Sequence, residues 1–171
     1  WRNQCNYQKC SKEFIVSEPI IINNGPRKGQ KRFPNDRAAG VGILLSPRMQ
    51  SKVHSFGSEG ERVCWVRLKG PVCNLFVLAV YLPHRRRVAP DQDQTLDDVR
   101  KVLSDIPARD YICLLGDFNE QVADNLKGIT GNWTGSPASA NASKVTDILR
   151  LHGFIAINTL FRPKKHSSVH T

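Results

Sequence analysis

The first half of the chain carries short apolar and β-branched runs that are separated by turn-forming residues. These runs favour strands, because β-branched and aromatic side chains suit a pleated, half-buried surface. The last two are joined across Gly70 and Pro71 and predict an antiparallel hairpin, whose first strand alternates as expected near a sheet edge. Pro19 interrupts the first run, which we interpret as one irregular strand region. The four runs are residues 14–22, 41–45, 63–68 and 74–82.

The first stretch in which apolar residues have helical spacing runs from Pro90 to Ile106. Apolar residues recur there at intervals of three, four and three, which predicts an amphipathic helix that packs on a sheet face. Thr95 and Asp98 resemble a capping box, and Pro107 ends the pattern. The apolar positions that we expect to face the core are Leu96, Val99, Leu103 and Ile106.

The C-terminal third is mainly loop, with one further helix. Glycines and prolines break any regular element between residues 121 and 142. A helix is predicted over residues 144–152, with Ser143 as its N-cap, Gly153 as its C-terminal stop, and Val145, Ile148 and Leu149 facing inward. Residues 154–157 predict a last short strand. The tail beyond Phe161, with His166 and His170, is basic and is expected to remain unpacked.

The stretch from Tyr111 to Asn119 joins a buried strand to two polar side chains. Residues 112–115 form an apolar run of the length expected for a strand buried on both faces, and Gly116 ends it. Asp117 and Asn119 follow at i and i+2, so in an extended segment both side chains point to the same side. Such a pair suits a hard cation and a phosphate. The alternative is a solvated turn in which both side chains satisfy local backbone groups.

Composition and charge favour one basic domain. The 171 residues, 40% of them hydrophobic, can bury one core and are expected to form a single domain. The net charge of +10 favours a polyanionic partner, either nucleic acid or an anionic membrane surface. No apolar run reaches the roughly 18–20 residues that span a bilayer. The chain starts at Trp1, without a signal peptide or an initiating Met, and is therefore expected to be a soluble, intracellular internal fragment.

Five cysteines, an odd number, predict reduced thiols in a reducing compartment. A zinc site lacks support because the sequence contains no C-x-x-C pair. Two glycosylation-type triplets would instead indicate a secreted protein, but without a secretion signal they are weak evidence. The triplets begin at Asn132 and Asn141.

Four ordered motifs resemble one family of phosphoesterases. Leu115-Gly116-Asp117-Phe118-Asn119 is similar to the GDxN signature of the endonuclease/exonuclease/phosphatase superfamily, which includes AP endonucleases and the endonuclease domains of non-LTR retrotransposons. The other three blocks resemble the retrotransposon-type branch, and together the four cover about residues 38–171. Residues 39–46 resemble its GVGxLLS strand, residues 80–84 its VYxPH segment, and residues 157–161 its INTxF segment.

The resemblance implies a fold and a chemistry. The fold is an α/β (α+β) architecture, a two-layered β-sandwich flanked by helices as in AP endonucleases and deoxyribonucleases. The implied activity is Mg²⁺-dependent phosphodiester hydrolysis, with Mn²⁺ as a possible substitute, and most simply the nicking of DNA. The family's Asp, here Asp117, orients or activates the attacking water; its Asn, here Asn119, holds the phosphate or that water; and Tyr81 matches the tyrosine whose hydroxyl points at the phosphate.

Several family motifs are missing from the sequence. An early Asn and a metal-binding Glu would precede Trp1, and a late Asp-His pair would follow Thr171, so we expect a domain truncated at both ends that cleaves DNA poorly or not at all by itself. The resemblance further implies a nuclear protein whose chain continues into a reverse transcriptase. Two other readings stay open, namely a phosphatase of the same superfamily acting on inositol phosphates or other small esters, and a non-catalytic binding remnant.

A run of three arginines, Arg85, Arg86 and Arg87, directly follows the strand that carries Tyr81. We expect this run to emerge beside the site and to contact DNA backbone phosphates. The alternatives are a solvated loop and a nuclear-import patch.

Overall fold

The computed structural model describes residues 20–23, 41–84, 89–134, 137–139 and 142–162. The chain divides into two compact units, Trp1–Asp117 and Phe118–Thr171, which are described separately below. The boundary falls inside the motif that carries Asp117 and Asn119.

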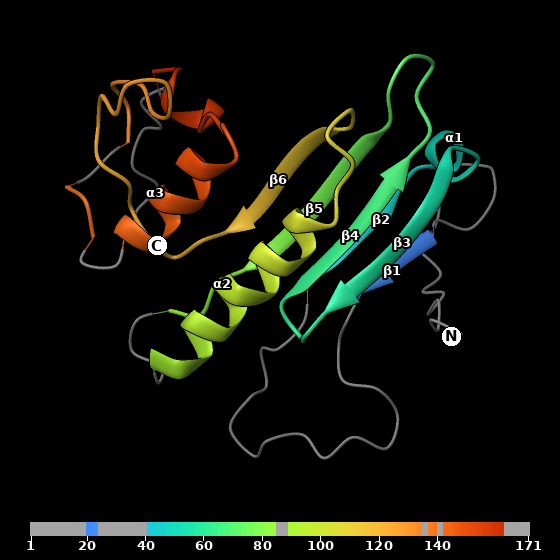
Figure 1. Cartoon of the computed structure of the whole chain (residues 1–171), viewed down its shortest axis with the longest axis horizontal. Coiled ribbons are helices and arrows are strands. Elements are labelled where there is room, and N and C mark those ends of the chain that lie inside the picture. Colours follow the sequence, from blue (N-terminus) through green and yellow to red (C-terminus); the bar gives the residue numbers. More distant parts are fainter. Residues whose placement is uncertain (1–19, 24–40, 85–88, 135–136, 140–141, 163–171) are drawn as a thin grey trace, which may run out of the picture. The chain divides into compact units, whose positions relative to one another are not determined.

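The first unit is built on a four-stranded sheet (Figure 1). Its strand order is β3-β4-β5-β6; β3, β4 and β5 are antiparallel neighbours, and β6 runs parallel to β5. A separate pair, β1 and β2, is antiparallel. The strands are β1 Ile20–Asn23, β2 Gly42–Leu45, β3 Val53–Glu59, β4 Val63–Leu68, β5 Leu75–Tyr81 and β6 Tyr111–Asp117; the helices are α1 Pro47–Gln50 and α2 Ala89–Ser104.

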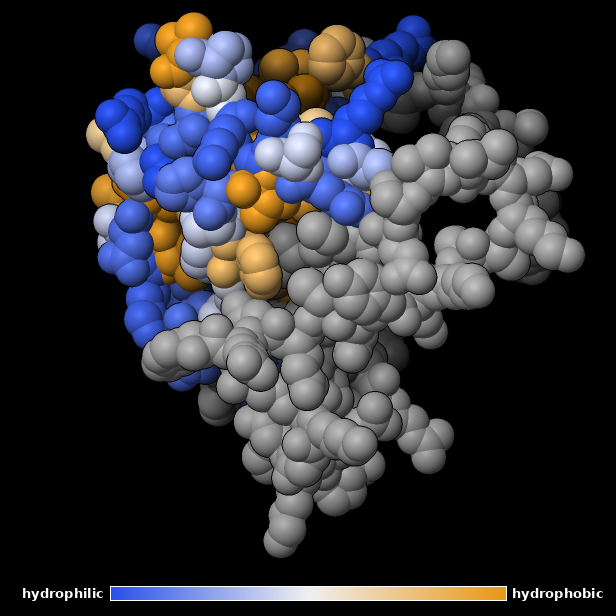
Figure 2. Space-filling model, turned by 90° about the vertical axis from the view of Figure 1, so that its right-hand side faces the viewer, coloured by the Kyte–Doolittle hydropathy of each residue, from blue (hydrophilic) through white to orange (hydrophobic). Residues whose placement is uncertain are grey.

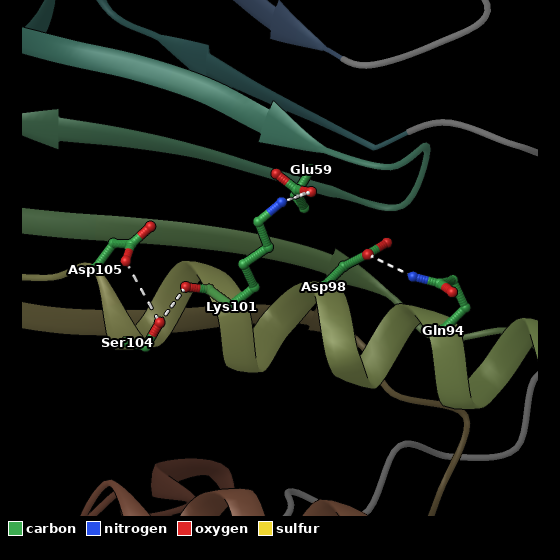
Figure 3. Close-up of polar contacts among 6 residues, drawn as sticks. All are labelled: Glu59, Gln94, Asp98, Lys101, Ser104 and Asp105. Carbon is green, nitrogen blue, oxygen red and sulfur yellow. Dashed lines mark hydrogen bonds and ion pairs between the residues drawn. The ribbon is translucent and has the colours of Figure 1, made fainter.

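The four-stranded sheet is covered on both faces. On one face, Leu45 of β2 forms a core cluster with Val66 and Leu68 of β4. On the other face lies α2, and Figure 3 shows Lys101 reaching from this helix to Glu59 at the end of β3. The Lys101 Nζ and a carboxylate oxygen of Glu59 are 2.6 Å apart. The mixed α/β class predicted from the sequence is therefore confirmed for the described residues.

The hairpin predicted from the apolar runs is the β4–β5 pair. Its first strand, β4, was predicted to lie near the sheet edge; it is an inner strand next to the edge strand β3. The strand missing from the sequence interpretation is β3, whose sequence VHSFGSE mixes polar and small residues. Its residues are mostly half-buried, so no continuous apolar run marked it.

Helix α2 agrees with the predicted pattern except at its two ends. It ends at Ser104, so Ile106, predicted to face the core, lies beyond the helix and is half-buried. Leu96, Val99 and Leu103 are buried, as predicted. The predicted capping box is wrong, because the helix begins at Ala89 and Thr95 lies within it. The Thr95 hydroxyl instead donates to the carbonyl of Asp91 at 2.8 Å, one turn earlier.

An ion pair ties β4 to the start of β6. The Arg67 guanidinium donates to both carboxylate oxygens of Asp110, at 2.5 and 3.0 Å, and the Asp110 side chain is fully shielded from solvent. This two-point geometry is the strongest form of an arginine–carboxylate contact. The hydrogen bond from Arg67 lowers the pKa of the Asp110 carboxyl below its usual value.

The lowered pKa of Asp110 predicts a specific acid sensitivity. A carboxyl whose pKa falls on folding stabilises the protein above the unfolded value, about 3.9, and that stability is lost as the pH falls through the lower folded pKa. We expect Asp110→Asn to lower the free energy of unfolding at neutral pH, and its difference from wild type to shrink below about pH 4. Urea unfolding across this pH range measures the difference. The control is Asp97→Asn, which removes a carboxylate from an exposed i,i+3 ion pair and should change stability little. If the difference in unfolding free energy between Asp110→Asn and wild type does not change with pH, the prediction is contradicted.

The second unit contains helix α3, Ala142–Leu151, and a single 3₁₀ turn, η1, Ile157–Thr159, among its described residues. Val145, Ile148 and Leu149 are buried, as predicted. Gly153 has a φ of 65° just after α3, as expected for a helix-terminating glycine. Ser143 is not the N-cap, because α3 already begins at Ala142.

The strand predicted over residues 154–157 is wrong, since a 3₁₀ turn begins at Ile157. The reason is a hydrogen-bond network around Thr159, which is 2% exposed and bonded to a residue far away in the sequence. Its hydroxyl accepts from the backbone N–H of Gly131 at 2.8 Å and donates to the carbonyl of Ala156 at 2.6 Å. Closing this turn holds the segment in a non-extended conformation.

Among the described residues, no cysteine takes part in a disulfide. Cys64 is buried, whereas Cys73 and Cys113 are half-buried. Burial raises the pKa of the Cys64 thiol to about 11, which disfavours its reactive thiolate form. Cys5 and Cys10 lie outside the described residues.

The described surface is mixed in character. On the face shown in Figure 2, the coloured side chains are mainly hydrophilic, with smaller hydrophobic groups between them. No helix in the described parts of the chain is both long and apolar enough to cross a membrane.

Candidate functional site

Two of the predicted site residues lie side by side at one edge of the sheet. Tyr81 is the last residue of β5, Asp117 is the last residue of β6, and the parallel register pairs them directly. The backbone N–H of Leu82 donates to the carbonyl of Asp117 at 2.8 Å and extends this pairing past the strand end. Because partners in a parallel pair project to the same face, the register brings the phenol and the carboxylate together.

Gly116 allows this close approach of the two strand ends. It lies within β6, so the strand continues one residue beyond the glycine that was predicted to end it. A Cβ atom at this position would lie 1.8 Å from the carbonyl oxygen of Val80. Its φ of 146° is also one that residues with a side chain rarely adopt. The sequence prediction that bulk is unwelcome at this position is confirmed.

Asn119 departs from the extended geometry predicted for it. Its φ is 47°, in the left-handed region, so the segment does not continue as a strand from Asp117 to Asn119. The extended backbone on which the same-side placement was inferred therefore ends before Asn119, and the placement itself stays a prediction. Asparagine is one of the few residues with a side chain that tolerate this conformation, and such outliers are enriched at functional sites. Asn119 is half-buried and belongs to the second unit, whereas Asp117 ends the first.

Arg62, which the sequence interpretation did not single out, lies in the same row. The backbone N–H of Tyr81 donates to the carbonyl of Arg62 at 3.0 Å, one position beyond the paired residues Val63 and Val80. The Arg62 guanidinium lies 5.7 Å from the centroid of the Tyr81 ring. Arg62, Tyr81 and Asp117 thus form a row across three neighbouring strand ends.

The row combines groups suited to phosphate chemistry. The carboxylate of Asp117 belongs to an exposed residue and can accept hydrogen bonds, while the Tyr81 phenol can donate one. Arg62 is only 7% exposed and contributes a positive charge that is held inside the protein. A water bound at the carboxylate and an anion bound near the phenol would therefore lie next to each other.

The metal implied by the family resemblance has limited support from these side chains. Among the described residues, no group of three or more His, Cys, Asp or Glu side chains could hold a metal ion. Magnesium, however, commonly keeps several waters and binds through one or two carboxylates together with substrate phosphates. The exposed Asp117 carboxylate fits that restricted role.

The predicted phosphate-contacting run Arg85, Arg86 and Arg87 lies outside the described residues. The chain leading to it is described as far as His84, and Pro83 before it is buried. The carbonyl of Pro83 accepts a hydrogen bond from the Gln92 side chain at 3.5 Å, which ties the segment after β5 to α2.

Comparison with known proteins gives a distant likeness. No family model matches the chain. Over 127 residues it is 24% identical to craniofacial development protein 2 of Tragulus javanicus, and equally to the protein of the same name from Bos taurus. Each alignment covers 74% of this chain and 22% of the relative, so the chain spans about a fifth of the length of these curated relatives.

Proposed function

We propose that this chain carries the water- and phosphate-handling part of a phosphodiesterase site that nicks DNA, in a fold of the AP-endonuclease type. The observation that carries the proposal is the β5–β6 register, which pairs Tyr81 with Asp117 at the carboxyl ends of two parallel strands. The GDxN-like and VYxPH-like motifs that supply these residues support the same conclusion. The net charge of +10 favours a polyanionic substrate such as DNA.

Each residue has a distinct role in the proposed reaction. Asp117 accepts a proton from the attacking water, for which an exposed acceptor-only carboxylate is suited. Tyr81 donates its hydroxyl proton in a hydrogen bond to a phosphate oxygen. The motif resemblance alone assigns Asn119, which belongs to the second unit, an amide that binds the phosphate or the water without adding a negative charge.

Magnesium, if bound at Asp117, would act as a Lewis acid and offset the charge that develops on the phosphate oxygens. The side chains of this chain do the remaining work by orienting the water and the phosphate. Because a single carboxylate binds Mg²⁺ weakly, we expect the 171-residue chain alone to nick DNA slowly.

The test compares two phosphoester substrates in Mg²⁺. The complete reading frame containing this chain, and the 171-residue chain itself, are each incubated with supercoiled plasmid and with inositol phosphates. We expect the complete frame to nick plasmid, the isolated chain to do so much more slowly, and neither to release inorganic phosphate from inositol phosphates. Phosphate release without nicking would instead indicate a small-ester phosphatase, and inactivity of the complete frame on both substrates would indicate a binding remnant.

A further inference from the structure

Arg62 occupies an unusual place for a charged residue. It lies in the turn between β3 and β4, next to Val63, and only 7% of its surface is exposed. Burying a guanidinium is costly in free energy unless nearby groups compensate the charge. One such group is the ring of Tyr81, whose face attracts a cation. The position therefore couples a buried charge to a proposed site residue.

The strand register makes this contact specific. Arg62 faces Tyr81 just beyond the antiparallel β4–β5 ladder, since the backbone N–H of Tyr81 donates to the carbonyl of Arg62 one position past the Val63–Val80 pair. Tyr81 in turn stands opposite Asp117 in the parallel β5–β6 ladder. The ring of Tyr81 is thus flanked by Arg62 on one side and by the Asp117 strand end on the other.

A second arginine, within β4, shows the contrast. Arg67 lies at the other end of β4, and its guanidinium is held by the two oxygens of Asp110. It is paired with Phe76 in the β4–β5 register, so it is remote from Tyr81. Arg67 has a structural role in joining strands, whereas Arg62 contacts the side chain that the proposed chemistry uses.

We propose that Arg62 is a positioning residue for Tyr81. Its guanidinium fixes the phenol ring at the end of β5, so that the hydroxyl meets a phosphodiester bound beside Asp117. This inference rests on the proposed function for the identity of the ligand, a DNA phosphodiester. The orientation of the Tyr81 ring, however, can be tested without any ligand.

The ligand-free test uses fluorine NMR of the 171-residue chain labelled with 3-fluorotyrosine. The chain has three tyrosines, and the resonance of Tyr81 is identified by its loss in Tyr81→Phe. We expect Arg62→Leu to shift and broaden this resonance and Arg62→Lys to restore it in part, because lysine keeps the charge but lacks the planar face. Tyr111, at the opposite end of the β6 register, should be unaffected by either change.

Arg67→Leu is the matched control, and it should leave the Tyr81 resonance unchanged even where it lowers stability. Far-UV circular dichroism checks that each variant folds. Should Arg62→Leu fail to fold, Arg62→Lys alone decides, since it also removes the planar contact. A Tyr81 resonance that is the same in wild type and in the folded Arg62 variant overturns the inference.

A double-mutant cycle connects the contact to ligand binding. The probe is a fluorescein-labelled DNA duplex, and affinity is measured for the wild type, Tyr81→Phe, Arg62→Leu and the double variant. Loss of one hydrogen bond should weaken binding about 3- to 10-fold in Tyr81→Phe. If Arg62 acts through Tyr81, adding Tyr81→Phe to Arg62→Leu should weaken binding little further.

The two proposals fail in different ways. Multiplicative losses in the double variant would show that Arg62 acts independently of Tyr81, and would overturn the positioning role while leaving DNA binding intact. Absence of duplex binding by the wild type would count against the proposed function. The fluorine resonance would then still decide whether Arg62 orients the Tyr81 ring.

Discussion

Replacing Asp117 by asparagine is expected to lower the rate of plasmid nicking by about 10²–10⁴-fold, the usual contribution of a general base. The substitution keeps the size of the side chain and removes the group that accepts the proton from water. DNA affinity should stay the same or rise slightly, because a negative charge near the phosphate is lost. Nicking rates in Mg²⁺ and duplex binding, both measured on the complete reading frame, separate the two effects.

Asp97→Asn provides the control for this experiment. Asp97 is exposed on α2 and contacts Arg100 on its own helix, at 2.7 Å. Its replacement removes the same charge from an exposed position on the helix and should leave the nicking rate unchanged. Nicking by Asp117→Asn within about threefold of wild type would exclude Asp117 as the general base, given the size of effect expected for that role.

Replacing Gly116 by alanine should destabilise the first unit by about 3 kcal/mol or more, through backbone strain and steric overlap together. The new methyl group would meet the carbonyl oxygen of Val80 at 1.8 Å, and this oxygen belongs to the backbone of a buried strand. Relief requires β5 and β6 to move apart at the point where Tyr81 and Asp117 are paired. Urea unfolding measures the loss, and nicking should fall as well.

The variant Gly128→Ala separates the effect of backbone strain from that of steric overlap. Gly128 also has a positive φ, 73°, but nothing lies within 4 Å of a Cβ built there. Alanine at this position should therefore cost only about 1 kcal/mol, from the backbone conformation alone. Equal losses in the two variants would mean that the close approach to Val80 contributes nothing.

Local patterns in the sequence were sufficient for several elements because the relevant interactions lie close together along the chain. The spacing of Leu96, Val99 and Leu103 predicted the buried face of α2, and Gly153 marked the end of α3. The same reasoning failed where distant residues decide the conformation. Residues 154–157 look like a strand, yet a hydrogen bond between Thr159 and Gly131 accompanies a 3₁₀ turn instead.

The candidate site likewise contains residues that the sequence could predict and one that it could not. Asp117 and Tyr81 could be proposed from the sequence because each lies in a short motif at the end of an apolar run. Arg62 could not, since a hairpin whose strands are joined by residues 69–74 leaves its register open. The only signal was a charged residue directly before an apolar strand, which is a common surface pattern.

The sequence by itself determined the residue types available at the strand ends, the amphipathic faces of α2 and α3, and the need for glycine at position 116. Only the tertiary structure decided that β4, β5 and β6 align Arg62, Tyr81 and Asp117 in one row. The physical reason is that strand register depends on hydrogen bonds and packing between segments far apart in the chain. Tyr81 and Asp117 are separated by a whole helix, and only their pairing makes them neighbours.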